Sequence, residues 1–125
     1  LAVLARHGGV GLGTSDVFVN VVGGVRIDEP GGDLAVALAV VSAQSGRPAT
    51  GPDGKPLACF GELGLTGDVR FVGHADRRVA EAAKFGLNPV IGPPSGERLA
   101  GLAPCPTVRK ALKAAFPTGR QQAAA

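Results

Sequence analysis

The sequence contains no tryptophan, tyrosine or methionine, and phenylalanine occurs only five times. Its core must therefore be built from alanine, valine and leucine, whose small side chains favour close contact between helices and sheets. Cysteine is also scarce: Cys59 and Cys105 are too few for a disulfide framework or a zinc cluster. We expect both to be buried, reduced thiols.

Long apolar runs are absent too. No run reaches the roughly 18 residues that a membrane-spanning helix needs, and no charged and apolar leader precedes the first expected strand. The chain of 125 residues is long enough for one domain with a single core. Because it begins inside an expected strand and has no methionine, we interpret it as a fragment of a longer protein.

Charge of either sign is limited, with 13 Lys and Arg against 10 Asp and Glu, a formal net charge of +3. This balance permits an anionic partner without requiring one. The stretch "GVGLG" at 9–13 imitates a phosphate-binding loop, but no GK[ST] follows it. The two histidines, His7 and His74, do not have the spacing of metal ligands, so no metal site is predicted.

The N-terminal part predicts strands. Residues 1–6 are expected to form a short strand, and "DVFVNVV" at 16–22 and "VRIDE" at 25–29 flank Gly23-Gly24, which is typical of a hairpin turn. Residues 34–45 are apolar or small at almost every position, so they predict a helix buried on all sides. Asp33 is expected to cap this helix, because its carboxylate can accept hydrogen bonds from the first backbone amides.

The remaining elements alternate strands and helices. Residues 57–65 and 68–72 predict a second hairpin around Thr66-Gly67. Residues 76–85 predict a helix with Val79, Ala82 and Ala83 facing inward, ended by Gly86. Further expected elements are a strand within 87–94, a short helical piece at 95–102, and a last helix with Thr107 as N-cap and Val108, Ala111, Leu112 and Ala115 on its apolar face.

This order of elements indicates an α+β domain. Its expected bounds are 1–117, followed by a flexible tail at 118–125.

Two blocks of the sequence resemble the proteolytic domain of the Lon protease family. They are "EPGGDLAVALAVVSAQSGRP" and "FGELGLTGDVRFVGHADRRVAEAAKFGLNPVIGPP". In that family the first block carries a nucleophilic serine and the second a lysine base, and burial must lower the pKa of such a lysine before it can take a proton. Here the serine position is Gly31 and the lysine position is Asp76. The resemblance therefore implies the fold of a Lon protease domain, with β-hairpins and a mixed sheet packed on a buried helix, without the catalytic pair.

The same blocks, together with "DVFVNVVGG", more closely resemble the C-terminal Lon-like domain of the RadA (Sms) family of bacterial DNA repair proteins. That resemblance implies a cytoplasmic recombination ATPase that forms a homohexameric ring. It also implies that ATP, Mg and Zn bind to N-terminal parts outside this chain, and that this fragment binds no cofactor.

A displaced serine nucleophile is the competing interpretation, which would make the domain an active peptidase. Ser42 and Ser45 lie within or at the far end of the expected buried helix, where a nucleophile would be inaccessible. Ser15, His74 and Asp76 have the residue types of a catalytic triad, but nothing in the sequence brings them together. A third interpretation is a module that only oligomerises.

The residues that indicate an anionic partner are arginines. Arg26 precedes the Gly31 loop, Arg70 precedes the Asp76 position, and Arg77 and Arg78 begin the following helix. Given the family resemblance, we expect these four to contact DNA phosphates without reading sequence, because guanidinium groups bind phosphate well. The competing interpretation is that they are solvated charges balanced by Asp28, Asp68 and Glu81. Arg109, Lys110 and Lys113 are expected to form an ordinary wet helix face.

Overall fold

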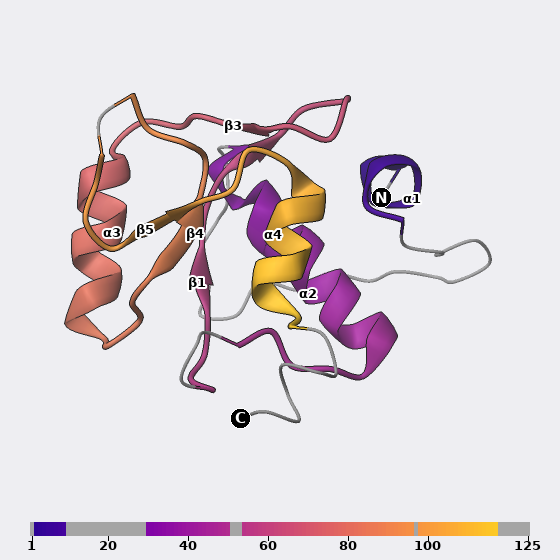
Figure 1. Ribbon diagram of the computed structural model, residues 1–125, viewed down its shortest axis with the longest axis horizontal. Helices are drawn as coiled ribbons and strands as arrows, with labels where there is room; N and C mark the ends of the chain where they lie inside the picture. The colour runs from indigo at the N-terminus through magenta and orange to yellow at the C-terminus, as the bar shows by residue number, and fades with distance from the viewer. Residues whose placement is uncertain (1, 10–29, 51–53, 97, 118–125) are drawn as a thin grey trace.

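A computed structural model of the chain describes residues 2–9, 30–50, 54–96 and 98–117. Their mixture of helices and strands confirms the α+β class (Figure 1). The predicted hairpin at 16–29 and the predicted tail at 118–125 lie outside the described residues. The elements, in order, are α1 (Ala2–His7), the 3-10 helix η1 (Pro30–Gly32), α2 (Asp33–Ser45), β1 (Ala58–Cys59), β2 (Glu62–Leu63), β3 (Val69–Arg70), α3 (Ala75–Lys84), β4 (Val90–Gly92), β5 (Leu102–Pro104) and α4 (Val108–Ala115).

The described strands form two sheets, one parallel and one antiparallel. The first has the order β1-β4-β5, and all of its neighbours are parallel. Val90 is the register partner of both Ala58 and Leu102. The second sheet is the antiparallel pair β2-β3, in which Glu62 lies opposite Arg70. The β2-β3 pair confirms the predicted second hairpin, with Thr66 in its turn.

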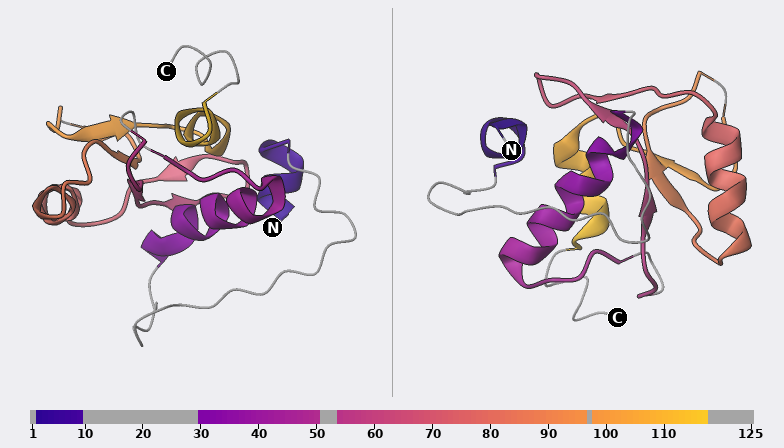
Figure 2. Two further views of the ribbon diagram at one scale, coloured as in Figure 1. Left: turned by 90° about the horizontal axis from the view of Figure 1, so that it is seen from below. Right: turned by 180° about the vertical axis from the view of Figure 1, so that it is seen from behind.

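Helices cover both faces of the parallel sheet (Figures 1 and 2). Val90 packs into a cluster with Phe60 and the buried face of α3. The next residue, Ile91, packs into a different cluster with residues of α2 and α4. This alternation follows from the pleat of a strand, which sends successive side chains to opposite faces. The parallel sheet is therefore the central layer, with α3 on one side and α2 and α4 on the other.

The helix α2 confirms the predicted apolar segment but corrects two details. Its N-cap residue is Gly32, and Asp33 is the first helical residue, so Asp33 does not cap the helix. The Asp33 carboxylate instead accepts a hydrogen bond from the Leu63 amide over 3.1 Å. Burial is also one-sided, because Ala35 and Ala39 are exposed while Leu34 is fully buried. Apolar composition thus did not imply burial all round.

Two local predictions were wrong, and tertiary packing decided the observed conformation in each. The expected strand at 1–6 is the helix α1, which buries Leu4 against α2 and α4. Alanine and leucine favour helices, and packing of an apolar face decides a segment this short. The expected helical piece at 95–102 contains no helix among its described residues, and Leu102 begins β5. Its pairing with Val90 of β4 fixes that extended conformation.

The helices α3 and α4 confirm the predicted segments with one correction. In α3, Val79 and Ala82 are buried as expected, whereas Ala83 is exposed. In α4, the Thr107 side chain accepts a hydrogen bond from the Lys110 amide over 3.2 Å, which confirms the predicted cap. The apolar face of α4 is buried at Val108, Ala111 and Ala115, and Leu112 is partly buried.

Candidate nucleic-acid interface

The Gly31 position lies in η1, directly before α2, and is buried. Its carbonyl oxygen accepts a hydrogen bond from the Gly61 amide over 2.9 Å, and the Gly61 carbonyl accepts one from the Leu34 amide over 3.0 Å. These two bonds insert the start of α2 at the break between β1 and β2. The loop therefore serves the fold through its backbone, with no side chain present at the position expected for a nucleophile.

The Asp76 position lies in the first turn of α3 and is exposed. It follows Ala75, which packs in one cluster with Phe60, and Phe60 precedes the Gly61 that holds Gly31. Ala75, beside the Asp76 position, and Gly61, which is bonded to the Gly31 position, are thus both next to the Phe60 cluster in the chain or in space. Glycine offers no hydroxyl there, and an exposed carboxylate is no substitute for a desolvated amine.

The other polar residues considered for catalysis are placed separately. The Ser42 hydroxyl donates to the Arg47 carbonyl over 2.6 Å at the far end of α2, and the Ser45 hydroxyl oxygen lies 3.4 Å from the Arg47 amide. His74 is exposed as the N-cap residue of α3. Ser15 lies outside the described residues. Over the part of the chain that the structure describes, no three His, Cys, Asp or Glu side chains gather as a metal site.

Arg70 lies on β3 with its charge already balanced. Its Nε atom is 3.1 Å from the Asp68 carboxylate, and Glu62 is its register partner on β2. The Thr66 hydroxyl, which donates to Asp68 over 2.7 Å, and the Arg70 guanidinium both hold the pKa of Asp68 below its ordinary value. The side chain of Arg70 remains about half exposed, at 53%. It can reach a phosphate, but it would have to leave Asp68 to do so.

Arg77 and Arg78 lie side by side at the start of α3. Arg77 is exposed and forms no ion pair with any described residue. The Arg78 Nε donates to the Gly73 carbonyl over 3.0 Å, and its guanidinium carbon lies 5.6 Å from the centre of the Phe60 ring. These contacts hold the Arg78 side chain along α3. Glu81, which the competing interpretation assigned to balancing the arginines, pairs with Lys84 over 3.1 Å.

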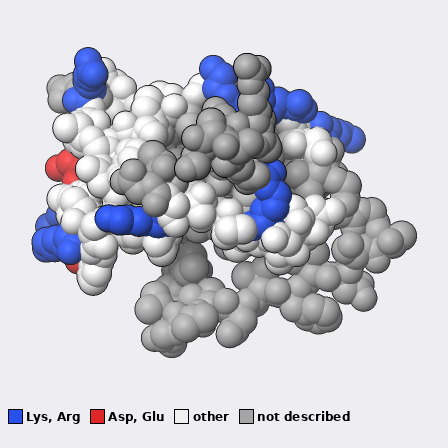
Figure 3. Space-filling model, turned by 60° about the horizontal axis from the view of Figure 1, so that its bottom comes forward, with Lys and Arg blue, Asp and Glu red and all other residues white. Residues whose placement is uncertain are grey.

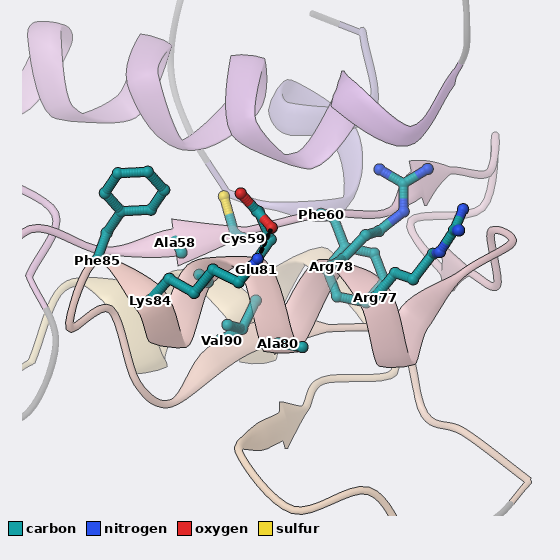
Figure 4. A pocket seen from close by; sticks show the side chains of 11 residues that line it. Ala58, Cys59, Phe60, Arg77, Arg78, Ala80, Glu81, Lys84, Phe85 and Val90 are labelled. Atoms are coloured by element: carbon teal, nitrogen blue, oxygen red, sulfur yellow. Dashed lines mark hydrogen bonds and ion pairs between the residues drawn. The ribbon is translucent and has the colours of Figure 1, made fainter.

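A hollow of about 640 Å³ lies between α3 and β1, and Arg77 and Arg78 stand at one end of it (Figure 4). Lys84 and Phe85 stand at the other end. The sequence predicted that Lys84 faces outward but gave no signal for the hollow, because the hollow forms only when α3 packs beside β1. Phe85 is 74% exposed, an unusual position for a large apolar ring.

Both cysteines carry raised pKa values. Burial raises the pKa of the half-buried Cys59, which lines the hollow, from 9.0 to about 11. Burial also raises the pKa of Cys105, and the charge of Lys110 partly opposes that effect. Neither cysteine forms a disulfide with a described residue; Cys105 is buried as expected, whereas Cys59 is only partly buried.

The exposed charges of the described residues are mostly basic. Figure 3 shows Lys and Arg side chains spread over one face, with few acidic ones in view. Exposed acidic residues are Asp76 and Glu81. Exposed basic residues are Arg6, Lys55, Arg70, Arg77, Lys84, Arg98, Arg109, Lys110 and Lys113. Arg26, the fourth arginine expected at DNA, lies outside the described residues. None of the described helices has the length and apolar character that a membrane crossing requires.

Comparison with known proteins gives a consistent set of relatives. No family model matches the chain. The DNA repair protein RadA of Escherichia coli is 48% identical over 93 residues, which cover 74% of this chain and 19% of the relative. The RadA of Listeria monocytogenes is 38% identical over 127 residues, covering 94% of this chain and 26% of the relative. The RadA of Brucella abortus is 51% identical over 87 residues, which cover 70% of this chain and 18% of the relative.

This chain therefore spans only about a fifth to a quarter of the length of these relatives. The similarity confirms the resemblance to RadA proteins, and the chain belongs, across the matched residues, to the RadA family.

Proposed function

We propose that this chain is a proteolytically inactive, Lon-like domain that acts as a hexamer scaffold and a DNA-binding platform in a RadA-type repair and recombination ATPase. The observation that carries the binding role is the excess of exposed cations over exposed acids, with Arg77 exposed and unpaired among the described residues. Similarity to proteins named for DNA repair supports the setting.

The absence of a nucleophile supports the loss of proteolysis. Acyl transfer by a serine–lysine pair, as in Lon proteases, needs a hydroxyl beside a neutral amine. Gly31 and Asp76 supply neither group. The Gly31 carbonyl and the Leu34 amide are both used in hydrogen bonds to Gly61. The loop thus has a structural reason to persist after its reactive side chain is gone.

DNA contact is proposed through phosphates and independent of sequence. Arg77 is the principal contact, and Arg78 and Arg26 contribute further contacts. Arg70 contributes as well when its guanidinium leaves Asp68 and binds a phosphate instead. A domain with net charge +3 binds weakly by itself. A homohexameric ring repeats the same surface around one duplex, which raises the effective concentration of the basic groups without new contacts.

The remaining activities belong to parts of the protein outside this chain. We propose that ATP and Mg bind an ATPase domain there, that Zn binds a separate finger, and that the whole protein works in the bacterial cytoplasm. The chain itself needs no cofactor for the role assigned to it.

DNA binding by the protein that carries this chain tests the proposal. Arg77→Ala should weaken duplex affinity several-fold and lower the slope of log affinity against log salt by about one, because each phosphate contact releases counterions. Lys113→Ala is the matched control, since Lys113 is an exposed cation on α4, across the sheet from α3. Equal effects of the two variants would reject Arg77 as a specific contact.

Two further measurements separate the competing functions. A serine-directed covalent probe with unfolded casein should give neither labelling nor cleavage; labelling of one serine would favour a peptidase. Light scattering should show a hexamer. If the whole protein forms a hexamer, and a variant that lacks this chain binds DNA with the same affinity, the chain is a pure oligomerisation module.

A further inference from the structure

The hollow between α3 and β1 combines an apolar floor with a basic rim. Its floor includes Ala58, Phe60 and Val90, all from the central sheet region. The Cys59 thiol beside them is uncharged at neutral pH, and burial raises its pKa further, to about 11. Among the described residues that line the hollow, the charged side chains are those of α3. Its volume of about 640 Å³ falls in the range of ordinary small-molecule sites.

The rim carries cations at both ends of α3. Arg77 and Arg78 stand at the N-terminal end and Lys84 at the C-terminal end (Figure 4). Among the described residues of the lining, Glu81 is the single acid, and it is already paired with Lys84. The rim thus has a net positive charge, which suits a ligand with an anionic group.

Aromatic rings complete the arrangement. Phe60 is only 4% exposed and carries the Arg78 guanidinium over its face. Phe85 is 74% exposed at the opposite end, so its ring is available to stack. A planar apolar group between these ends would cover Phe85 and the floor, while its anionic part would meet Arg77.

We propose that this hollow binds the base of an unpaired nucleotide in a single DNA strand, with the adjoining phosphate on Arg77. This rests on the proposed DNA-binding function and adds a preference within it. A nucleotide has the required planar face and anionic group. In a duplex the bases are stacked and paired, so they cannot enter the hollow. Duplex binding should use the arginines alone, and single-strand binding should use the arginines and the hollow.

Separate variants of the full protein test the stacking of the base and the electrostatic attraction of the phosphate. Phe85→Ala should lower affinity for a fluorescent single-stranded oligonucleotide at least about fivefold and leave duplex affinity unchanged, because stacking on a ring is lost. Phe71→Ala is the matched control, since Phe71 is also a largely exposed phenylalanine, at 63%, and does not line the hollow. Equal effects of the two variants on single-strand affinity would overturn the proposal.

Ala80 gives a second test that does not endanger folding, because it is exposed on α3 and lines the hollow. Ala80→Glu should weaken single-strand binding and Ala80→Lys should strengthen it, in proportion to the added charge. Equal effects of the two Ala80 variants on single-strand affinity would overturn the assignment to the hollow.

A competition experiment distinguishes the source of the nucleotide. A free nucleoside monophosphate should displace the fluorescent single strand far less effectively than an unlabelled oligonucleotide does, because it lacks neighbouring phosphates. Equal displacement would assign the hollow to a free nucleotide and overturn the strand assignment. Failure of the proposed function has a different signature: duplex affinity would then be insensitive to Arg77→Ala, whatever happens at Phe85.

Discussion

The backbone amide of Gly61 donates a hydrogen bond to the Gly31 carbonyl oxygen over 2.9 Å. This bond holds Gly31, the residue at the expected nucleophile position, against the segment between β1 and β2. The bond from the Leu34 amide to the Gly61 carbonyl, over 3.0 Å, completes the connection. Removal of the serine side chain would leave both bonds intact, which explains physically how the loop and the buried helix can remain without catalysis.

Gly61 should tolerate no side chain. Its φ is +147°, and a Cβ there would lie 2.6 Å from the Cγ1 atom of Val69. Gly61→Ala should therefore lower the free energy of unfolding by about 2 to 4 kcal/mol through overpacking and backbone strain, measured by urea denaturation. Gly73→Ala is the control, because nothing lies within 4 Å of a Cβ at that position. Similar losses for both variants would contradict the contact.

His74 adopts a left-handed conformation, with φ of +65°, immediately before α3. This backbone conformation costs a residue with a Cβ roughly 1 kcal/mol or more. His74→Gly should raise the free energy of unfolding by about 0.5 to 1 kcal/mol, after the greater entropy of unfolded glycine is included. His74→Ala keeps the Cβ and should show no such gain. A glycine variant no more stable than the alanine variant would refute the strain.

Thr107 should contribute through its hydroxyl. Its side chain accepts a hydrogen bond from the Lys110 amide over 3.2 Å at the start of α4. Thr107→Ala should cost about 1 kcal/mol of stability, whereas Thr107→Ser should retain most of it, because serine offers the same acceptor. Thermal and urea denaturation of the two variants measure the difference. Equal stability of the alanine and serine variants would show that the cap contributes nothing.

Cys59 should make stability depend on pH in the alkaline range. Its pKa is raised from 9.0 to about 11 in the folded chain, so the unfolded chain loses the thiol proton first. The corresponding stability is fully present below pH 9 and is lost as the pH rises through this window. Cys59→Ala should therefore show a shallower decline between these pH values than the parent protein. Urea midpoints measured across the window check this, and parallel profiles would contradict the shift.

The sequence by itself determined the class of the fold and the residues that stand at the expected catalytic positions. Apolar residues at 34–45, Thr107 before an amphipathic segment, and Thr66-Gly67 between two β-prone runs each specify an element through local physics, and α2, α4 and the β2-β3 pair follow them. Gly31 and Asp76 were likewise found by sequence alone, since they depend on the register of two blocks and not on contacts.

Tertiary structure decided the rest, because the deciding interactions join residues far apart in the chain. Residues 57–65 look like one strand, but docking of Leu34 and Gly31 on Gly61 divides them between two sheets. Packing of Leu4 against α2 and α4 made residues 2–7 helical. The hollow beside Phe60 exists only because α3 crosses next to β1, and no local pattern in either segment could reveal a cavity formed between them.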